Sequence, residues 1–120
     1  MTIAAAQAQQ FYEQVATDGR VFTFLEDDSY LVFRISDMDV IPFWSSRSRL
    51  DEVQNTHAKY RKYLADEISL DAFLTKTLPQ LRDEQIRIGV NWSGQRLTGY
   101  DLSADELEKN LKSRISKKPA

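Results

Sequence analysis

Two pairs of neighbouring carboxylates are the residues of this sequence best suited to chemistry. Asp27 and Asp28 are adjacent, and Asp37 and Asp39 are separated by one residue. Paired carboxylates can ligate a divalent cation or act as general acid and base in a hydrolase. Both pairs lie in short polar segments between apolar runs, where Asp is a common turn residue. We therefore interpret both pairs as hairpin turns and expect neither a metal site nor a catalytic pair.

The residues that the common catalytic motifs require are missing from the sequence. The chain of 120 residues contains no cysteine and one histidine, His57, and its 4 glycines are scattered. It has no glycine-rich phosphate-binding loop and no Gly-x-Ser-x-Gly turn for a nucleophile. A site assembled in space needs no local motif, so a hydrolase remains an alternative. We predict no cofactor and no catalytic residue, and we expect binding rather than catalysis.

Serines and arginines follow an apolar run at Val40–Trp44. The segment Ser45–Arg49 could hold a phosphate or another anion through free backbone donors at the start of a helix. Capping of that helix by one of the serines accounts for the same pattern, and we favour this interpretation. What remains unexplained is an aromatic residue at the strand end with two cations beyond it. We therefore predict a candidate interaction surface formed by Trp44, Arg47 and Arg49.

Aromatic and basic residues alternate in the segment Lys59–Leu64. Surfaces of this composition bind single-stranded nucleic acids, because bases stack on the rings and cations meet the phosphates. A half-buried strand whose charges protect an exposed edge gives the same alternation. We expect a strand over residues 59–63. Nucleic-acid binding through this strand is an alternative, with these residues in the binding surface: Lys59, Arg61, Lys62 and Tyr63.

The composition is that of a globular domain. With 42% hydrophobic and 28% charged residues, the chain suits one domain over residues 1–120, with a frayed tail at 116–120. A net charge of -2 argues against a general nucleic-acid or anionic-membrane binder. The N-terminal residues do not resemble a signal peptide, and no apolar run is long enough for a membrane span. We expect a cytoplasmic protein that does not contact a membrane.

Hydrophobic periodicity predicts the elements that position these residues in the first half of the chain. A helix over residues 3–16 stops at Gly19. Three closely spaced strands follow, over residues 20–25, 30–35 and 40–44. The short polar turns between them predict an antiparallel meander. Pro42 cannot donate to a neighbouring strand, so we expect the third strand at an edge or interrupted by a bulge.

The second half is predicted to be richer in helix. Ser46 or Ser48 caps a short helix, and Ser69 caps a longer one that ends or kinks near 77–78 because Pro79 lacks a donor. A hairpin over residues 86–92 and 96–100 turns at Gly94. Ser103 and Glu106 then form the capping box of a final helix.

These elements define a fold class. We predict one α+β domain with a largely antiparallel sheet, made of the N-terminal three-stranded meander and later strands, covered by about four helices. The predicted core consists of Phe11, Val15, Phe22, Phe24, Leu31, Phe33, Ile41, Phe43, Phe73, Leu74, Leu78, Ile88, Val90, Leu107 and Leu111.

The order of several short motifs resembles a known family. The motifs are Tyr30–Phe33, Val40–Trp44, Leu70–Leu74 followed by Leu78-Pro79, Ile88–Val90 and Leu107–Leu111. Over residues 8–112 the chain resembles the small bacterial family called "domain of unknown function 2750". The resemblance implies a bacterial α+β domain. The family has no assigned activity, so the resemblance implies no catalytic residues.

Three classes of function compete at this level. We favour a non-catalytic module that binds another protein, for example an immunity-type inhibitor that blocks a toxin. The second class is the single-stranded nucleic-acid binder described above. The third is a small-molecule-binding domain or hydrolase with a site near Trp44, to which Trp92 could contribute. A homodimer formed through a strand edge is a further alternative for the partner.

Overall fold

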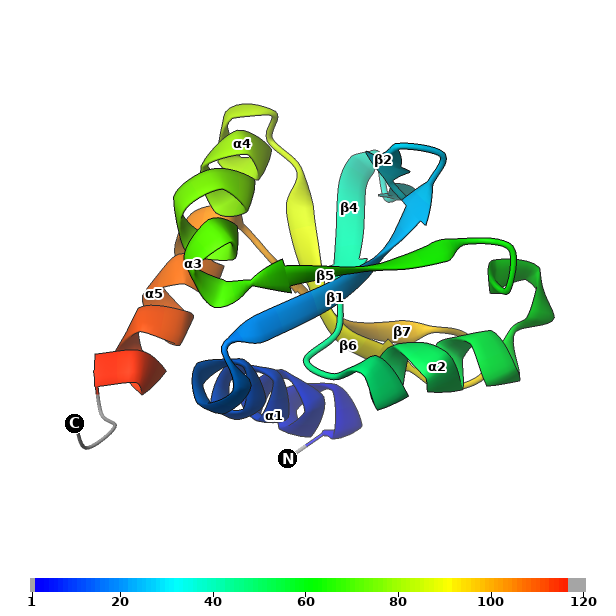
Figure 1. The fold of residues 1–120 in the computed structure, drawn as a ribbon, viewed down its shortest axis with the longest axis horizontal. Coiled ribbons are helices and arrows are strands. Elements are labelled where there is room, and N and C mark those ends of the chain that lie inside the picture. The colour runs from blue at the N-terminus through cyan, green and yellow to red at the C-terminus, as the bar shows by residue number, and fades with distance from the viewer. Residues whose placement is uncertain (1, 117–120) are drawn as a thin grey trace.

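The computed structural model describes residues 2–116, so the predicted frayed tail lies, except for Ser116, outside the described residues. Figure 1 shows two small sheets that cross each other, with helices around them. In chain order the elements are α1 (Ile3–Asp18), β1 (Arg20–Glu26), β2 (Ser29–Tyr30), β3 (Phe33–Ile35), β4 (Met38–Phe43), α2 (Arg47–Thr56), the 3₁₀-helix η1 (Ala58–Tyr60), β5 (Leu64–Ser69), α3 (Leu70–Ala72), the π-helix η2 (Phe73–Thr77), α4 (Leu78–Asp83), β6 (Arg87–Ser93), β7 (Thr98–Leu102) and α5 (Ala104–Ser116). No helix among residues 2–116 is both long enough and apolar enough to cross a bilayer.

The predicted α+β class is confirmed, and the strands divide into two sheets. One sheet has the antiparallel order β2-β1-β5. The other has the order β3-β4-β6-β7, in which only the β4–β6 pair is parallel. The two sheets meet where the backbones of Phe22 and Trp44 exchange two hydrogen bonds of 2.8 Å.

The two antiparallel pairs of the predicted meander are present, but they lie in different sheets and not in one continuous sheet. The return strand breaks at Leu31–Val32, so that β2 pairs with β1 while β3 pairs with β4. Leu31 is buried, and its N–H donates to the Phe24 carbonyl, which extends the contact with β1 by one residue before the break. The longest partner of β1 is β5, which is distant in sequence and could not be identified from local turn patterns.

Pro42 lies in an interior strand, which contradicts the predicted edge position. It is opposite Gly89 in the parallel pair between β4 and β6. Its carbonyl accepts a hydrogen bond of 2.8 Å from the Thr23 hydroxyl, so this side of the residue faces away from β6. A residue's N and carbonyl lie on the same side of a strand, and β3 pairs only as far as Val40. The missing N–H of Pro42 therefore costs no ladder bond.

The predicted strand over residues 59–63 is also wrong. Residues 58–60 form η1, a turn follows, and β5 begins only at Leu64. Tyr60 is buried and Tyr63 is partly buried in the same cluster, with ring centroids 6.2 Å apart. Residues three apart share a face of a 3₁₀ turn but lie on opposite faces of a strand. Burial of both rings therefore selects the helical turn.

The local capping predictions are confirmed. Gly19 ends α1 with a left-handed φ of 75°, and the Ser46 hydroxyl accepts from the Arg49 N–H at the start of α2. The Ser103 hydroxyl and the Glu106 carboxylate form the reciprocal contacts of a capping box. The break predicted near residues 77–78 corresponds to the boundary between η2 and α4, where the helix widens to a π turn just before Pro79.

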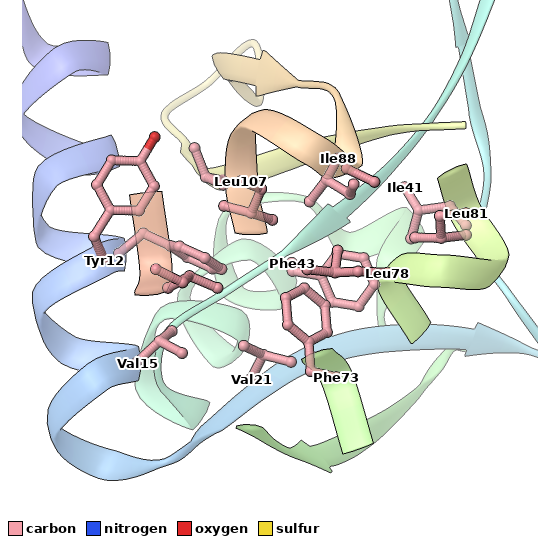
Figure 2. Close-up of a cluster of buried hydrophobic side chains, with 14 of the residues drawn as sticks. Tyr12, Val15, Val21, Ile41, Phe43, Phe73, Leu78, Leu81, Ile88 and Leu107 are labelled. Atoms are coloured by element: carbon pink, nitrogen blue, oxygen red, sulfur yellow. The ribbon is translucent and has the colours of Figure 1, made fainter. Parts of the chain in front are cut away.

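Two clusters make up the buried core. Figure 2 shows the first, in which side chains from α1, β1, β4, η2, α4, β6 and α5 point toward one another. The second surrounds Trp44 and lies between the crossing of the sheets and α2. All predicted core residues are buried except Phe33 and Leu74, which are partly buried against these clusters.

Candidate functional site

Trp44, the first residue of the predicted interaction surface, lies inside the second cluster. Its side chain is 1% exposed and its ring meets Phe24 edge-on, with centroids 5.2 Å apart. Its indole N–H donates to the Trp92 carbonyl at 2.8 Å. A ring with this burial cannot touch a partner and lines no open site. Trp44 therefore supports the surface from below.

A buried polar contact follows directly after Trp44. The Ser45 N–H donates to Asn91 Oδ1 at 2.9 Å, and the Ser45 hydroxyl donates to Gln14 Oε1 at 2.6 Å. Asn91 Nδ2 donates back to the Ser45 hydroxyl at 3.0 Å. These bonds connect α1, β6 and the chain between β4 and α2. The contact fixes where α2 begins and therefore where the two arginines lie.

Arg47 and Arg49 reach the surface on different sides of α2. Arg47 Nε donates to Asp51 Oδ1 at 3.0 Å in an exposed ion pair. Arg49 is partly buried and donates to the side-chain carbonyl of Gln10, and among residues 2–116 it forms no ion pair. Burial lowers the pKa of Arg49 below the ordinary arginine value. The structure thus brings Arg49 beside the polar face of α1, a juxtaposition that the sequence did not predict.

The segment that the nucleic-acid alternative requires has its rings already in contact with other side chains. Lys59 Nζ lies 5.2 Å from the ring centroid of Tyr60, and Lys62 Nζ lies 5.3 Å from that of Tyr63. Tyr60 also stacks on Phe24 within the core. Arg61 donates to a backbone carbonyl of α2. A base could stack on these rings only after the lysines moved.

The residues first considered for chemistry have structural roles. Asp27 and Asp37 adopt left-handed backbone conformations in the two turns, as the turn interpretation predicts. His57 Nε2 lies 2.8 Å from the Gly94 carbonyl, so its proton joins α2 to the β6–β7 turn. Within residues 2–116 no group of three or more His, Asp or Glu side chains is placed to hold a metal ion.

A cavity of about 580 Å³ lies beside the β2-β1-β5 sheet. It is bounded by the β1–β2 hairpin, β5, α4 and the residue just before β6. We call it the acidic cleft. Its apolar lining consists of the buried or partly buried Leu25, Tyr30, Ile41, Leu81 and Ile86 and, at the rim, the exposed Val32. Three carboxylates, Asp28, Asp66 and Glu84, lie around it, and none of the described residues that line it is basic. It therefore combines an apolar floor with a negative rim.

The carboxylates of the acidic cleft have no cationic partner. Among residues 2–116, none of the three forms an ion pair, and Glu84 accepts one weak hydrogen bond from Gln80. Burial raises the pKa of the Tyr30 phenol, a hydrogen bond with Thr77 partly opposes this, and the charge of Asp66 adds to it. The field in the cleft is therefore negative.

Sequence reasoning missed this cleft because its carboxylates come from positions 28, 66 and 84. The single local signal was the adjacent pair Asp27-Asp28, which also fits a turn. The convergence depends on the pairing of β1 with β5 and on the position of α4 across the end of the sheet. Neither could be inferred from local patterns.

Comparisons with known proteins place the chain in a family. No curated protein and no solved structure matches it. A family model matches residues 8–111, close to the range over which the sequence motifs indicated the resemblance. The chain belongs to the family described as "Protein of unknown function (DUF2750)".

Proposed function

We propose that this protein is a non-catalytic protein-interaction module whose acidic cleft receives a basic side chain of a partner protein. One observation carries the proposal: three carboxylates that have no cationic partner within residues 2–116 surround an apolar floor. Like charges that surround a cavity repel one another, and a bound cation relieves this repulsion. A small inhibitor of a basic toxin would be one protein of this kind.

Lysine and arginine fit both parts of the acidic cleft. Their aliphatic stems can lie on the partly exposed side chains of Leu25, Tyr30 and Ile86 while the charged ends reach the carboxylates. Each solvent-exposed ion pair contributes only about 0.2–1 kcal/mol. Because three such pairs give a weak complex at most, the partner must also bury apolar surface, and Val32, which is 46% exposed at the rim, offers it.

Of the predicted surface at Trp44, Arg47 and Arg49, mainly Arg49 is part of the proposed binding surface. Trp44 holds the start of α2 from inside, and Arg49 is the group offered to solvent. Its guanidinium has no carboxylate partner in the part of the chain that the structure describes, so an acidic group of the same partner could bind there as a second contact. Arg47 contributes less because Asp51 already neutralises it.

Two of the alternatives are less well supported. The rings that a single-stranded nucleic acid would need are covered by Lys59 and Lys62. The site near Trp44 that a small-molecule or hydrolase function would need is filled by packed aromatic side chains. We therefore base the proposal on the acidic cleft.

A selection from a random-peptide display library tests the proposal. We expect the immobilised protein to enrich peptides that contain Lys or Arg next to an apolar residue. The matched control is the triple variant Asp28→Asn/Asp66→Asn/Glu84→Gln, which keeps the shape of the cleft and removes its charge. We expect the enriched peptides to bind this variant at least tenfold more weakly.

Two results would overturn the proposal. One is a selection that enriches no peptide above the bare support. The other is a set of enriched peptides that lack Lys and Arg or that bind the neutral triple variant as tightly as the original protein. A variant with Arg47→Ala and Arg49→Ala, tested in parallel, distinguishes binding at the cleft from binding at the start of α2.

A further inference from the structure

Strand β5 has one partner strand and one open side. It occupies the end of the order β2-β1-β5 and pairs with β1 from Arg20↔Ser69 to Leu25↔Leu64 (Figure 1). An edge strand of this length presents a row of backbone donors and acceptors to solvent. The hydrogen bonds of β1 determine which groups of β5 these are.

The backbone N–H and carbonyl of Phe22 both bond to Trp44, on the side of β1 that faces away from β5. Phe22 is opposite Glu67, so this pair exchanges no hydrogen bonds. Hydrogen-bonded and non-bonded pairs alternate along an antiparallel ladder. The bonded pairs are therefore Val21↔Ile68, Thr23↔Asp66 and Leu25↔Leu64.

The backbone groups of Ala65 and Glu67 therefore point away from β1. No hydrogen bond to either residue from outside the sheet is present in residues 2–116. An extended segment placed along β5 could pair with both residues, as strands do when they extend a sheet.

The side chains of β5 determine what such a segment meets. Asp66 lines the acidic cleft, whereas Ala65 packs against the second cluster on the other face. Side chains of an added strand alternate between the two faces in the same way. Every second residue of the segment would therefore lie on the face that carries Asp66, and the one beside Asp66 would lie at the mouth of the cleft.

Charge selects the kind of segment. A second copy of this chain could pair its β5 antiparallel to this one. If the twofold axis of that pair passed through Asp66 or Glu67, identical carboxylates would lie opposite each other, which is unfavourable. A cationic segment meets the opposite situation, because Asp66 and the other carboxylates of the cleft lack basic partners. The edge thus favours a basic partner over self-association.

We propose that the partner binds as an extended segment that adds a strand to β5 and places Lys or Arg at alternate positions over the acidic cleft. The inference rests on the proposed function, since it uses the same cleft, and it adds the backbone conformation of the partner. It also predicts that binding protects two particular amide groups of this chain.

The test uses the synthetic peptide acetyl-Val-Lys-Val-Lys-Val-Lys-amide as a probe. Amide hydrogen exchange of the ¹⁵N-labelled protein is followed by NMR with and without saturating peptide. We expect exchange at Ala65 and Glu67 to slow at least tenfold, because their outward groups become hydrogen-bonded. Two controls are the same peptide with Glu in place of Lys, which should not bind, and the Lys peptide N-methylated at alternate residues, which should bind at least tenfold more weakly.

The outcomes separate this inference from the function on which it rests. If the Lys peptide shifts the resonances of the acidic cleft while exchange at Ala65 and Glu67 is unchanged, the added strand is overturned and the proposed function stands. Equal binding of the N-methylated peptide overturns the added strand as well. If neither the Lys peptide nor any peptide from the display selection binds, both proposals fall.

Discussion

At the scale of single residues, the most conspicuous side chain of the sequence has a structural role. Trp44 lies at the end of an apolar run, and the sequence pattern there is the same whether the side chain is exposed or buried. In the structure its ring fills the second cluster and its N–H is bonded to the Trp92 carbonyl. Of the residues that carry the proposed function, Asp66 and Glu84 have no local sequence signal, and Asp28 belongs to a pair that also fits a turn.

Removing the ring of Trp44 should destabilise the fold strongly. Truncation of a fully buried aromatic residue to Ala removes about 3–5 kcal/mol. We therefore expect Trp44→Ala to lower the free energy of unfolding by this amount in urea titrations followed by circular dichroism. Arg47→Ala, the surface control, loses only an exposed ion pair worth about 0.3–0.5 kcal/mol. Similar unfolding midpoints for the two variants would place Trp44 outside the core.

Arg49 should contribute to binding and not to stability. Its guanidinium is partly buried without a carboxylate partner, so Met at this position keeps the aliphatic contact and removes an unpaired charge. We expect Arg49→Met to unfold at the same urea concentration as the original protein or a higher one. A clear loss of stability would mean that the hydrogen bond to Gln10 outweighs the cost of burying the charge.

At the scale of elements, local sequence signals were sufficient to predict where helices begin and end. They were not sufficient to predict which strands pair in which sheet. The cap at Ser103 and the stop at Gly19 depend on neighbouring residues and were predicted, and Ser46 was one of the two serines predicted to cap α2. The position of Pro42 depends on where β3 stops pairing, which is a tertiary property. The helical turn at Tyr60 depends likewise on a cluster assembled from distant segments.

Two tyrosines that connect elements should make stability fall at alkaline pH. Tyr12 bonds to Asn110 between α1 and α5, and Tyr30 bonds to Thr77 between β2 and η2. Burial is the main cause that raises the pKa of both phenols above the ordinary value of 10.0. The unfolded chain then loses these protons first, so the stabilisation is complete below pH 10 and is lost as pH rises through the higher pKa of the folded state.

The measurement is the urea midpoint between pH 9 and pH 12, about the range in which tyrosine titrates. We expect the midpoint to fall less steeply in Tyr12→Phe/Tyr30→Phe than in the original protein. Parallel pH profiles would show that the two phenols titrate alike in the folded and unfolded states. The comparison uses slopes because loss of the two hydroxyl groups also lowers the midpoint at neutral pH.

At the scale of the whole molecule, the acidic cleft exists only because two sheets cross and α4 lies over the end of one of them. Tyr30, Ile41 and Leu81 meet there from β2, β4 and α4, and the carboxylates reach it from the β1–β2 turn, β5 and the end of α4. Composition and periodicity predicted the fold class and almost all of the core. They could not predict the cleft, because no two of its carboxylates are close in the sequence.

Family membership leaves the function open, so the proposed function is tested by where on the protein a partner binds. The most direct measurement is a map of ¹H–¹⁵N resonance shifts when a Lys- or Arg-containing peptide from the display selection is added to the protein. We predict the largest shifts at Asp28, Tyr30, Asp66 and Glu84, and their loss at high salt because exposed charge pairs are screened. The largest shifts at Arg47 and Arg49, or shifts that are indifferent to salt, would contradict the account.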